Sequence, residues 1–240
     1  MQCRLPRRIG FSTSVDYADN FADNDWATIA AVCAYGLVPA TWKIGDQKAM
    51  TINGASYLVD IIGIQHDDYA DGSGKAPFTF QMHNVYGTDY RMNSSSSNSC
   101  GWVNSLARKT HLPAILALMP QEVQNAIQEV KKLTSIGGGS NTISDTADKL
   151  FLLSCVETTG SLMLGTSTIQ IAASGEGSQY EYYAVGGSTA KQRDGSQGKY
   201  WTRSPQYSDS TFICSVNGLG DAETSNPTAT GYGLAFAFCF

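Results

Sequence analysis

A polar segment enclosed by two apolar strands constrains this chain more than any other feature. The segment follows Tyr200-Trp201-Thr202-Arg203-Ser204-Pro205 and ends before Tyr232-Gly233-Leu234-Ala235-Phe236-Ala237-Phe238-Cys239-Phe240. Between these strands Ser, Thr, Asn, Asp, Gly, Gln and Tyr dominate, and no Lys or Arg follows Arg203. Rigid strands that hold a polar segment are typical of a binding surface, because the scaffold supplies order and the loops supply contacts. The lack of basic residues excludes a platform for nucleic acid or other polyanions.

The apolar residues inside the segment divide it into two predicted faces. Phe212, Cys214 and Val216 alternate, so on a strand they share one face, which we expect in the core. Ile213 then faces solvent. The positions predicted to be exposed and to contact a ligand are Tyr207, Asp209, Thr211, Ile213, Ser215, Asn217, Leu219, Asp221, Glu223, Thr224, Asn226, Thr228, Thr230 and Tyr232. The predicted scaffold residues are Trp201, Arg203, Phe212, Cys214, Val216, Phe236 and Phe238, with Arg203 anchoring carbonyls or a carboxylate beneath the loops.

The composition favours one α+β domain. The chain has 240 residues, which is long for one domain and leaves two small ones open. With 42% hydrophobic residues it can bury a substantial core, and its low charged fraction of 15% favours a loop-rich fold over a helical bundle. A net charge of −5 argues against nucleic acid and anionic membranes as partners. No apolar run reaches the roughly 18 residues of a membrane span.

The N-terminus and the cysteines bear on location. The first eight residues are basic, but the apolar segment of a signal peptide does not follow. We therefore expect a protein that acts outside the cell to leave it by another route, such as lysis. Six scattered cysteines show no metal-ligand spacing, and we interpret them as buried free thiols, with a disulfide framework as the alternative. Cys214 and Cys239 are expected to be neighbours.

Local signals predict helices early and short strands late. Asn24-Asp25 caps a helix that ends at Gly36, and Asn53-Gly54 joins strands at 49–52 and 56–62 in a hairpin. We expect a strand at 78–82, helical segments over 101–107, 113–118 and 120–133, and a strand at 149–154. Residues 175–198 are expected to be irregular. The closing strands lie around residue 201, at 212–216 and at 234–240.

No motif predicts catalysis or a metal site. His66-Asp67-Asp68 offers an imidazole and two carboxylates, but neighbours on a strand point to opposite faces, so we favour a structural role. His83 and His111 have no partner at ligand spacing. Gly137-Gly138-Gly139-Ser140 lacks the Lys of a phosphate loop and follows a predicted helix, so we interpret it as a helix stop. We expect neither a cofactor nor a metal, and no enzymatic activity.

Four sequence blocks resemble a known group. The pattern YWTRSP…F.C.V…G.A……P….G.GLAFAFCF resembles the C-terminus of variable proteins that retroelements diversify in gut phages and bacteria. Three upstream blocks fit the same bacterial and phage domain of otherwise unknown function: WKIGD at 42–46, IQHDD at 64–68 and DKLFLLS at 148–154. The resemblance covers roughly residues 24–240. It implies a C-type-lectin-like fold with helical insertions and short antiparallel strands.

The resemblance also implies a function. In diversity-generating retroelement systems, miscopied adenines scatter Asn codons to residues such as Ser, Tyr, Asp, Thr, Ile and Gly, which is the mixture found at 206–232. We expect a receptor-binding protein at the tip of a phage tail, located in the virion and active in host attachment. Its partners would be a host-surface protein or glycan and other tail proteins. We expect a homotrimer, with residues 1–23 as an N-terminal extension that assists assembly.

Several alternatives remain open. The polar segment is also compatible with an ordinary surface loop region. A bacterial cell-surface adhesin of the same fold is the first rival function. A formylglycine-generating type of oxidase is a second, although Cys214 and Cys239 are far apart in sequence and do not form the close pair such enzymes use. A calcium-dependent lectin is a third. The Glu-Pro-Asn type of sugar-binding motif is not present, and Asn226-Pro227 matches it only in part.

Overall fold

An aromatic cluster around Phe80 occupies the centre of the fold. In the computed structural model, which describes residues 15–240, the Phe80 ring lies 5.3 Å from that of Phe238 and 5.8 Å from that of Trp26. Phe21 stacks on Phe80 at 6.0 Å between ring centroids. Residues 1–14 of the predicted N-terminal extension lie outside the described part. Phe21 is in the core, so the packed domain starts before residue 24.

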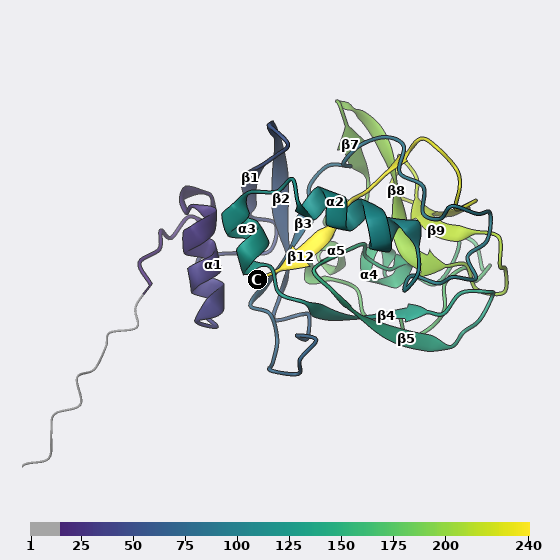
Figure 1. Ribbon diagram of the computed structural model, residues 1–240, viewed down its shortest axis with the longest axis horizontal. Coiled ribbons are helices and arrows are strands. Elements are labelled where there is room, and N and C mark those ends of the chain that lie inside the picture. The colour runs from purple at the N-terminus through teal and green to yellow at the C-terminus, as the bar shows by residue number, and fades with distance from the viewer. Residues whose placement is uncertain (1–14) are drawn as a thin grey trace, which may run out of the picture.

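The first sheet carries this cluster and brings distant parts of the chain together. Its strands pair antiparallel in the order β1-β2-β3-β12-β6. The strand bounds are β1 (Gln47–Ile52), β2 (Ala55–Ile64), β3 (Phe78–Met82), β12 (Ala237–Cys239) and β6 (Leu150–Phe151). The strand β12 therefore lies between two strands formed much earlier in the chain, near the middle of Figure 1.

The hairpin β1–β2 follows its local sequence. Asn53 and Gly54 have φ values of 49° and 79°, which is the left-handed region that the tight turn requires. Asp25 caps α1 (Trp26–Ala34) by accepting a bond from the Thr28 amide at 2.7 Å. Trp26 at the start of α1 donates from its indole to the Ala49 carbonyl at 3.0 Å, so the helix is fixed to the hairpin. These predicted elements are confirmed.

The second sheet holds the predicted binding segment. Its order is β10-β9-β8-β11, and β7 also pairs with β8. The bounds are β7 (Lys191–Arg193), β8 (Ser196–Pro205), β9 (Ile213–Val216), β10 (Ala222–Ser225) and β11 (Tyr232–Gly233). The pairs are antiparallel except β11 with β8. Figure 1 shows this sheet at the end of the molecule opposite α1.

A third, two-stranded sheet and several short helices complete the fold. A hairpin of β4 (Val130–Ser135) and β5 (Ile143–Asp148) runs along one side in Figure 1. The short helical segments are η1 (Phe21–Asp23), η2 (Ala107–His111), α2 (Leu112–Leu116), α3 (Gln121–Ala126), α4 (Cys155–Thr159) and α5 (Glu181–Ala184). Helices and mainly antiparallel sheets together confirm the α+β class.

The predicted helix over 120–133 is wrong in its second half. The helix α3 ends at Ala126, and β4 begins at Val130. Burial alternates along β4, with Val130, Lys132 and Thr134 inside. Because Lys132 is a charged residue at a buried position, the alternation of apolar and polar residues that indicates a strand could not be recognised in the sequence. Residues 137–141 are consequently the turn of a β-hairpin and not a helix stop.

Other predicted boundaries also shift. Residues 100–104 form turns, so the predicted helix at 101–107 begins only as it reaches η2, and α2 ends at Leu116. The predicted strand at 149–154 shortens to β6. The region 175–198, predicted to be irregular, contains α5, β7 and the start of β8. Helices and strands of two to four residues are too short to show a hydrophobic periodicity in the sequence.

Candidate binding surface

The structure divides the fourteen predicted contact positions into three groups. Four are exposed, namely Thr211, Leu219, Asp221 and Thr230. Seven are partly exposed, namely Tyr207, Asp209, Asn217, Glu223, Thr224, Asn226 and Thr228. Three are buried, namely Ile213, Ser215 and Tyr232, so their predicted exposure is wrong. Of the predicted scaffold, Phe212 is 36% exposed and is the one residue placed incorrectly.

These errors share one cause, which is that β9, β11 and the second half of β8 are buried on both faces. Ile213 and Tyr232 belong to the main core with Trp201, whose ring stacks on Tyr232 at 4.2 Å. Cys214 and Ala222 pack in a separate apolar cluster on the opposite face. The predicted alternation assumed a sheet with one face open to water, but here the residues between the core positions are covered as well. Phe212 lies before β9 begins, so it does not share the burial of that strand.

The accessible positions, except Thr230 before β11, form a strip along the β10 edge of the sheet. Residues 206–212 and 226–228 lie near the end of the strands where Pro205, Ile213 and Ser225 are paired. The turn at 217–221 lies at the other end. Four-residue strands separate these ends by about 13 Å, which a protein-sized ligand spans. The edge strand β10 connects them through the partly exposed Glu223 and Thr224.

A hydrogen-bonded cluster lies in the middle of this strip. The Tyr232 hydroxyl donates to the Glu223 carboxylate at 2.8 Å, and it also contacts the Ser225 hydroxyl. The Lys199 ammonium lies 3.8 Å from Glu223 and 5.7 Å from the Tyr232 ring centroid. Burial raises the pKa of Tyr232, so its hydroxyl remains protonated. Glu223 is therefore held in place by groups on two other strands, β8 and β11.

Asn98 joins the strip to two other loops, and sequence reasoning missed it. Its amide donates to the carbonyls of Asp209 at 2.7 Å and Phe212 at 2.6 Å. Its side-chain oxygen accepts from the Gly138 amide at 2.8 Å. Gly137 approaches so closely that a Cβ there would lie 2.0 Å from the Asn98 carbonyl oxygen. The only signal for this contact was an Asn at the end of a serine-rich loop, which does not identify a partner.

A buried ionic network supports the strip from below. Arg203 on β8 is fully buried and forms a two-pronged pair with the Glu157 carboxylate, one bond being 2.8 Å long. It also donates to three carbonyl oxygens, those of Leu152 at 2.9 Å, Leu133 at 3.0 Å and Glu176 at 3.1 Å. The predicted anchoring of carbonyls and a carboxylate by Arg203 is confirmed.

Lys132 extends this network to the first sheet. Its ammonium lies 2.9 Å from Glu157 and 2.7 Å from Asp67, and both partners are buried. Burial alone would raise the pKa of Asp67, but the charge of Lys132 and hydrogen bonds from Thr79 and Tyr180 lower it to about 2. The capping box of α4, in which Ser154 and Glu157 bond reciprocally, fixes the Glu157 side chain.

Glu176 is the exception in this network. Its carboxylate accepts from the Ser135 amide at 2.8 Å and contacts the Ser204 hydroxyl. Burial raises its pKa to about 7, because the hydrogen bonds and the charge of Arg203 compensate only part of the lost hydration. Glu176 is therefore the carboxyl group of this network with a raised pKa, in contrast to Asp67 and Glu157.

The histidine motif does not form a metal site. His66 lies 3.2 Å from Glu181, Asp67 faces Lys132, and Asp68 pairs with Lys75 at the surface. Within residues 15–240 no group of three or more His, Cys, Asp or Glu side chains is arranged to hold a metal ion. The structural interpretation of this motif thus agrees with the described contacts.

The other two histidines occupy different surroundings. His83 does have a carboxylate partner, since its Nδ1 lies 2.9 Å from Asp60, a residue too distant in sequence to be recognised. His111 lies beside Tyr90, with ring centroids 5.0 Å apart. Its Nε2 atom is buried without a hydrogen-bond partner, and burial lowers its pKa.

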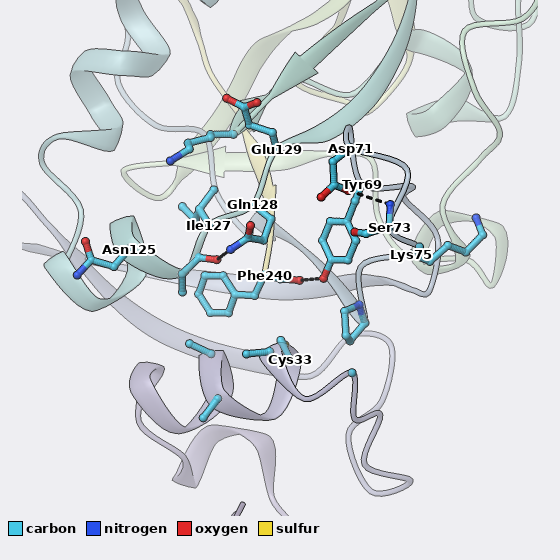
Figure 2. A pocket seen from close by; sticks show the side chains of 18 of the residues that line it. Cys33, Tyr69, Asp71, Ser73, Lys75, Asn125, Ile127, Gln128, Glu129 and Phe240 are labelled. Carbon is cyan, nitrogen blue, oxygen red and sulfur yellow. Dashed lines mark hydrogen bonds between the residues drawn. The ribbon is translucent and has the colours of Figure 1, made fainter. Parts of the chain in front are cut away.

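A groove of about 1150 Å³ lies away from the strip, between α1, the segment after α3 and the 69–75 loop. Figure 2 shows Tyr69 and Phe240 meeting in it, where the Tyr69 hydroxyl donates to the Phe240 carbonyl at 2.9 Å. Burial raises the pKa of both Cys33 and Tyr69 to about 12. Neither side chain is therefore a nucleophile at neutral pH.

In the described part of the chain, no helix has both the length and the hydropathy needed to cross a bilayer.

The fold and this strip define an α+β domain with a polar loop surface on a sheet whose central strands are buried. The chain belongs to the family described as a domain of unknown function, DUF6273, whose model matches residues 76–240. The match begins just before β3 and includes the second sheet, whereas α1 and the hairpin β1–β2 precede it. No curated protein and no solved structure matches the chain.

Proposed function

We propose that this protein binds a macromolecular ligand through the strip formed by residues 206–212, 217–221 and 223–228. The observation that carries the proposal is the division within the second sheet. Strands β9 and β11 and the second half of β8 are buried on both faces, and Arg203 anchors β8, whereas the polar side chains lie on the connecting loops and on the edge strand β10. The loops can change residues without changing the core, which is the arrangement a diversified binding surface requires.

The side chains of the strip suit protein or glycan recognition. Tyr207 offers a rigid amphipathic contact, Leu219 is 69% exposed at a turn, and Asn217 and Thr228 provide adaptable hydrogen bonds. Exposed carboxylates and the lack of Lys and Arg after Arg203 disfavour polyanionic ligands.

On the resemblance described above, we further propose a C-type-lectin-like fold and diversification by a retroelement. The protein would act at the tip of a phage tail, as a homotrimer that contacts a host-surface protein or glycan. Several weak sites on one particle would raise the avidity through effective concentration.

Deep sequencing of the 3′ end of this gene in a propagating population tests the proposal. We expect substitutions at adenines to concentrate in the eleven exposed or partly exposed codons and to spare the buried Ile213, Ser215 and Tyr232. The codons of the hairpin at 49–62 provide the internal baseline. Variation at 206–232 no greater than that of the hairpin would refute the diversification.

A binding assay tests the surface itself. Once a binding cell is found in a host panel, Leu219→Asp is expected to abolish attachment of the labelled protein. Leu118→Asp is the matched control, because Leu118 is 44% exposed on α2's connection to α3, away from the second sheet. Equal attachment by both variants would contradict the strip as the contact surface.

A further inference from the structure

Two cysteines meet in a small apolar cluster apart from the main core. Cys155 begins α4 and Cys214 lies in β9, and both side chains are fully buried. They pack with Ile171, Ala172 and Ala222 in one buried cluster. The expected proximity of Cys214 to Cys239 is wrong. Cys239 belongs to the first sheet, where its thiol contacts Thr79 at 3.4 Å.

The strand β8 fixes the backbones of both cysteines. The Cys155 amide donates to the Ser204 hydroxyl at 2.9 Å, and the Thr202 hydroxyl donates to the Cys214 carbonyl at 2.7 Å. Ser204 and Thr202 are two residues apart on the same strand. The two thiols are thus held in register by rigid elements and not by mobile loops.

One loop covers the pair. The Cys155 thiol is 3.6 Å from the Ser161 carbonyl, and the Cys214 thiol donates to the Ile171 carbonyl at 3.2 Å. These two acceptors stand at the two ends of the segment 161–171, whose Leu162 and Leu164 pack over the cluster. Opening this segment, or folding in the presence of an oxidant, exposes both sulfur atoms together.

We propose that Cys155 and Cys214 form a disulfide when the protein meets a small-molecule disulfide such as oxidised glutathione. The Cys155 thiolate attacks one glutathione sulfur, forms a mixed disulfide and releases one glutathione thiolate. The Cys214 thiolate then attacks the Cys155 sulfur and releases the second. Two electrons pass from the cysteines to glutathione, and the two cysteine protons end on the two reduced glutathione molecules.

The surroundings of the sulfurs support this order. The neighbouring Cys214 lowers the pKa of Cys155 despite burial, whereas burial raises that of Cys214. The link would tie β9, next to the edge of the binding strip, to α4 and its Glu157–Arg203 pair. This inference is independent of the binding proposal, since it concerns only the buried side of the sheet.

Refolding of the full chain from urea, in buffer with oxidised and reduced glutathione, tests the proposal. Free thiols are then alkylated, and the protein is digested without reduction for mass spectrometry. We expect one linked peptide pair containing Cys155 and Cys214, with Cys33, Cys100 and Cys239 alkylated. Closing a loop of about 60 residues is expected to raise Tm by about 10 °C relative to protein refolded with dithiothreitol.

Variants separate this link from others. Cys214→Ala is expected to abolish both the linked peptide and the Tm difference between the two buffers, whereas Cys33→Ala keeps both. Complete alkylation of Cys155 and Cys214 in the wild-type chain would overturn the proposal. A dominant link between any other pair, including one with Cys3, would overturn it equally. The wild-type readout decides the question even where a variant fails to fold.

Discussion

Replacement of Arg203 by Met probes how the buried network supports the binding strip. Met preserves most of the aliphatic volume of Arg but removes the guanidinium. The Glu157 carboxylate would keep Lys132 at 2.9 Å and the Ser154 amide at 3.0 Å. The three carbonyl oxygens that accept bonds from Arg203 would lose those bonds in a dry interior.

The magnitude follows from these losses. Removing one member of a buried, hydrogen-bonded ion pair lowers the free energy of unfolding by about 3–5 kcal/mol, because the remaining charge stays buried. A domain has a total free energy of unfolding of about 5–15 kcal/mol. We therefore expect Arg203→Met to lose about a fifth or more of its stability and in the extreme case to populate the unfolded state.

Urea unfolding followed by tryptophan fluorescence measures this change. Trp42, Trp102 and Trp201 are almost fully buried and report on distant parts of the fold. The midpoint should fall while the slope m stays constant, as expected when only the native state is weakened. Arg193→Met is the matched control. Arg193 makes one bond of 3.2 Å, to the Gly231 carbonyl, so we expect a change below about 0.5 kcal/mol.

If Arg203→Met lowers the free energy of unfolding by less than about 1 kcal/mol, the prediction is refuted. The buried ionic network around Arg203 would then not determine the stability of the second sheet. A double-mutant cycle with Glu157→Gln adds an internal test. Because the two side chains contact each other directly, the losses should be clearly less than additive. Additive losses would show that the pair acts independently despite its geometry.

Three further predictions concern pH, the loops and the first hairpin. Burial raises the pKa of Glu176 to about 7 in the folded state, above the ordinary glutamate value of 4.5, so the folded state retains a proton that the unfolded state has lost. This stability is fully present below pH 4.5 and is lost as the pH rises to 7, by about 3 kcal/mol. In urea titrations from pH 4.5 to 8, Glu176→Gln should weaken the pH dependence of the free energy of unfolding. An unchanged pH dependence would contradict the raised pKa of Glu176. Asn98→Ala removes three hydrogen bonds to the loops at 138 and 209–212, so hydrogen exchange in those loops should accelerate, whereas Asn141→Ala should leave residues 209–212 unchanged. Gly54→Ala places a side chain at φ 79° in open space, and we expect a loss of about 1–2 kcal/mol in the free energy of unfolding, with wild-type stability counting against the turn.

Local sequence determined the elements whose signals are contained within a few residues. Asp25 caps α1, Asn53 and Gly54 form the tight turn, and the alternating residues of 78–82 form β3. These predictions succeeded because capping and turn geometry depend on neighbouring backbone atoms and require no distant partner. The α+β class followed from the same signals.

Tertiary structure alone decided which faces are buried. Ile213 and Ser215 alternate with core residues and looked exposed, yet the main core covers their side of the sheet. Lys132 looked like a surface residue, and its burial depends on Asp67 and Glu157, which come from other segments. A charged side chain can be buried only where groups of opposite charge surround it. When those groups are distant in sequence, a local sequence pattern does not predict the burial.

The candidate site shows the same division. The sequence by itself determined that residues 206–232 are polar, lack Lys and Arg, and lie between apolar strands, because composition and order are read directly from the chain. The tertiary structure decided that eleven of fourteen positions are accessible, that Asn98 joins the loops, and that Cys214 meets Cys155. Each of these depends on contacts between segments separated by tens of residues, which only the folded chain brings together.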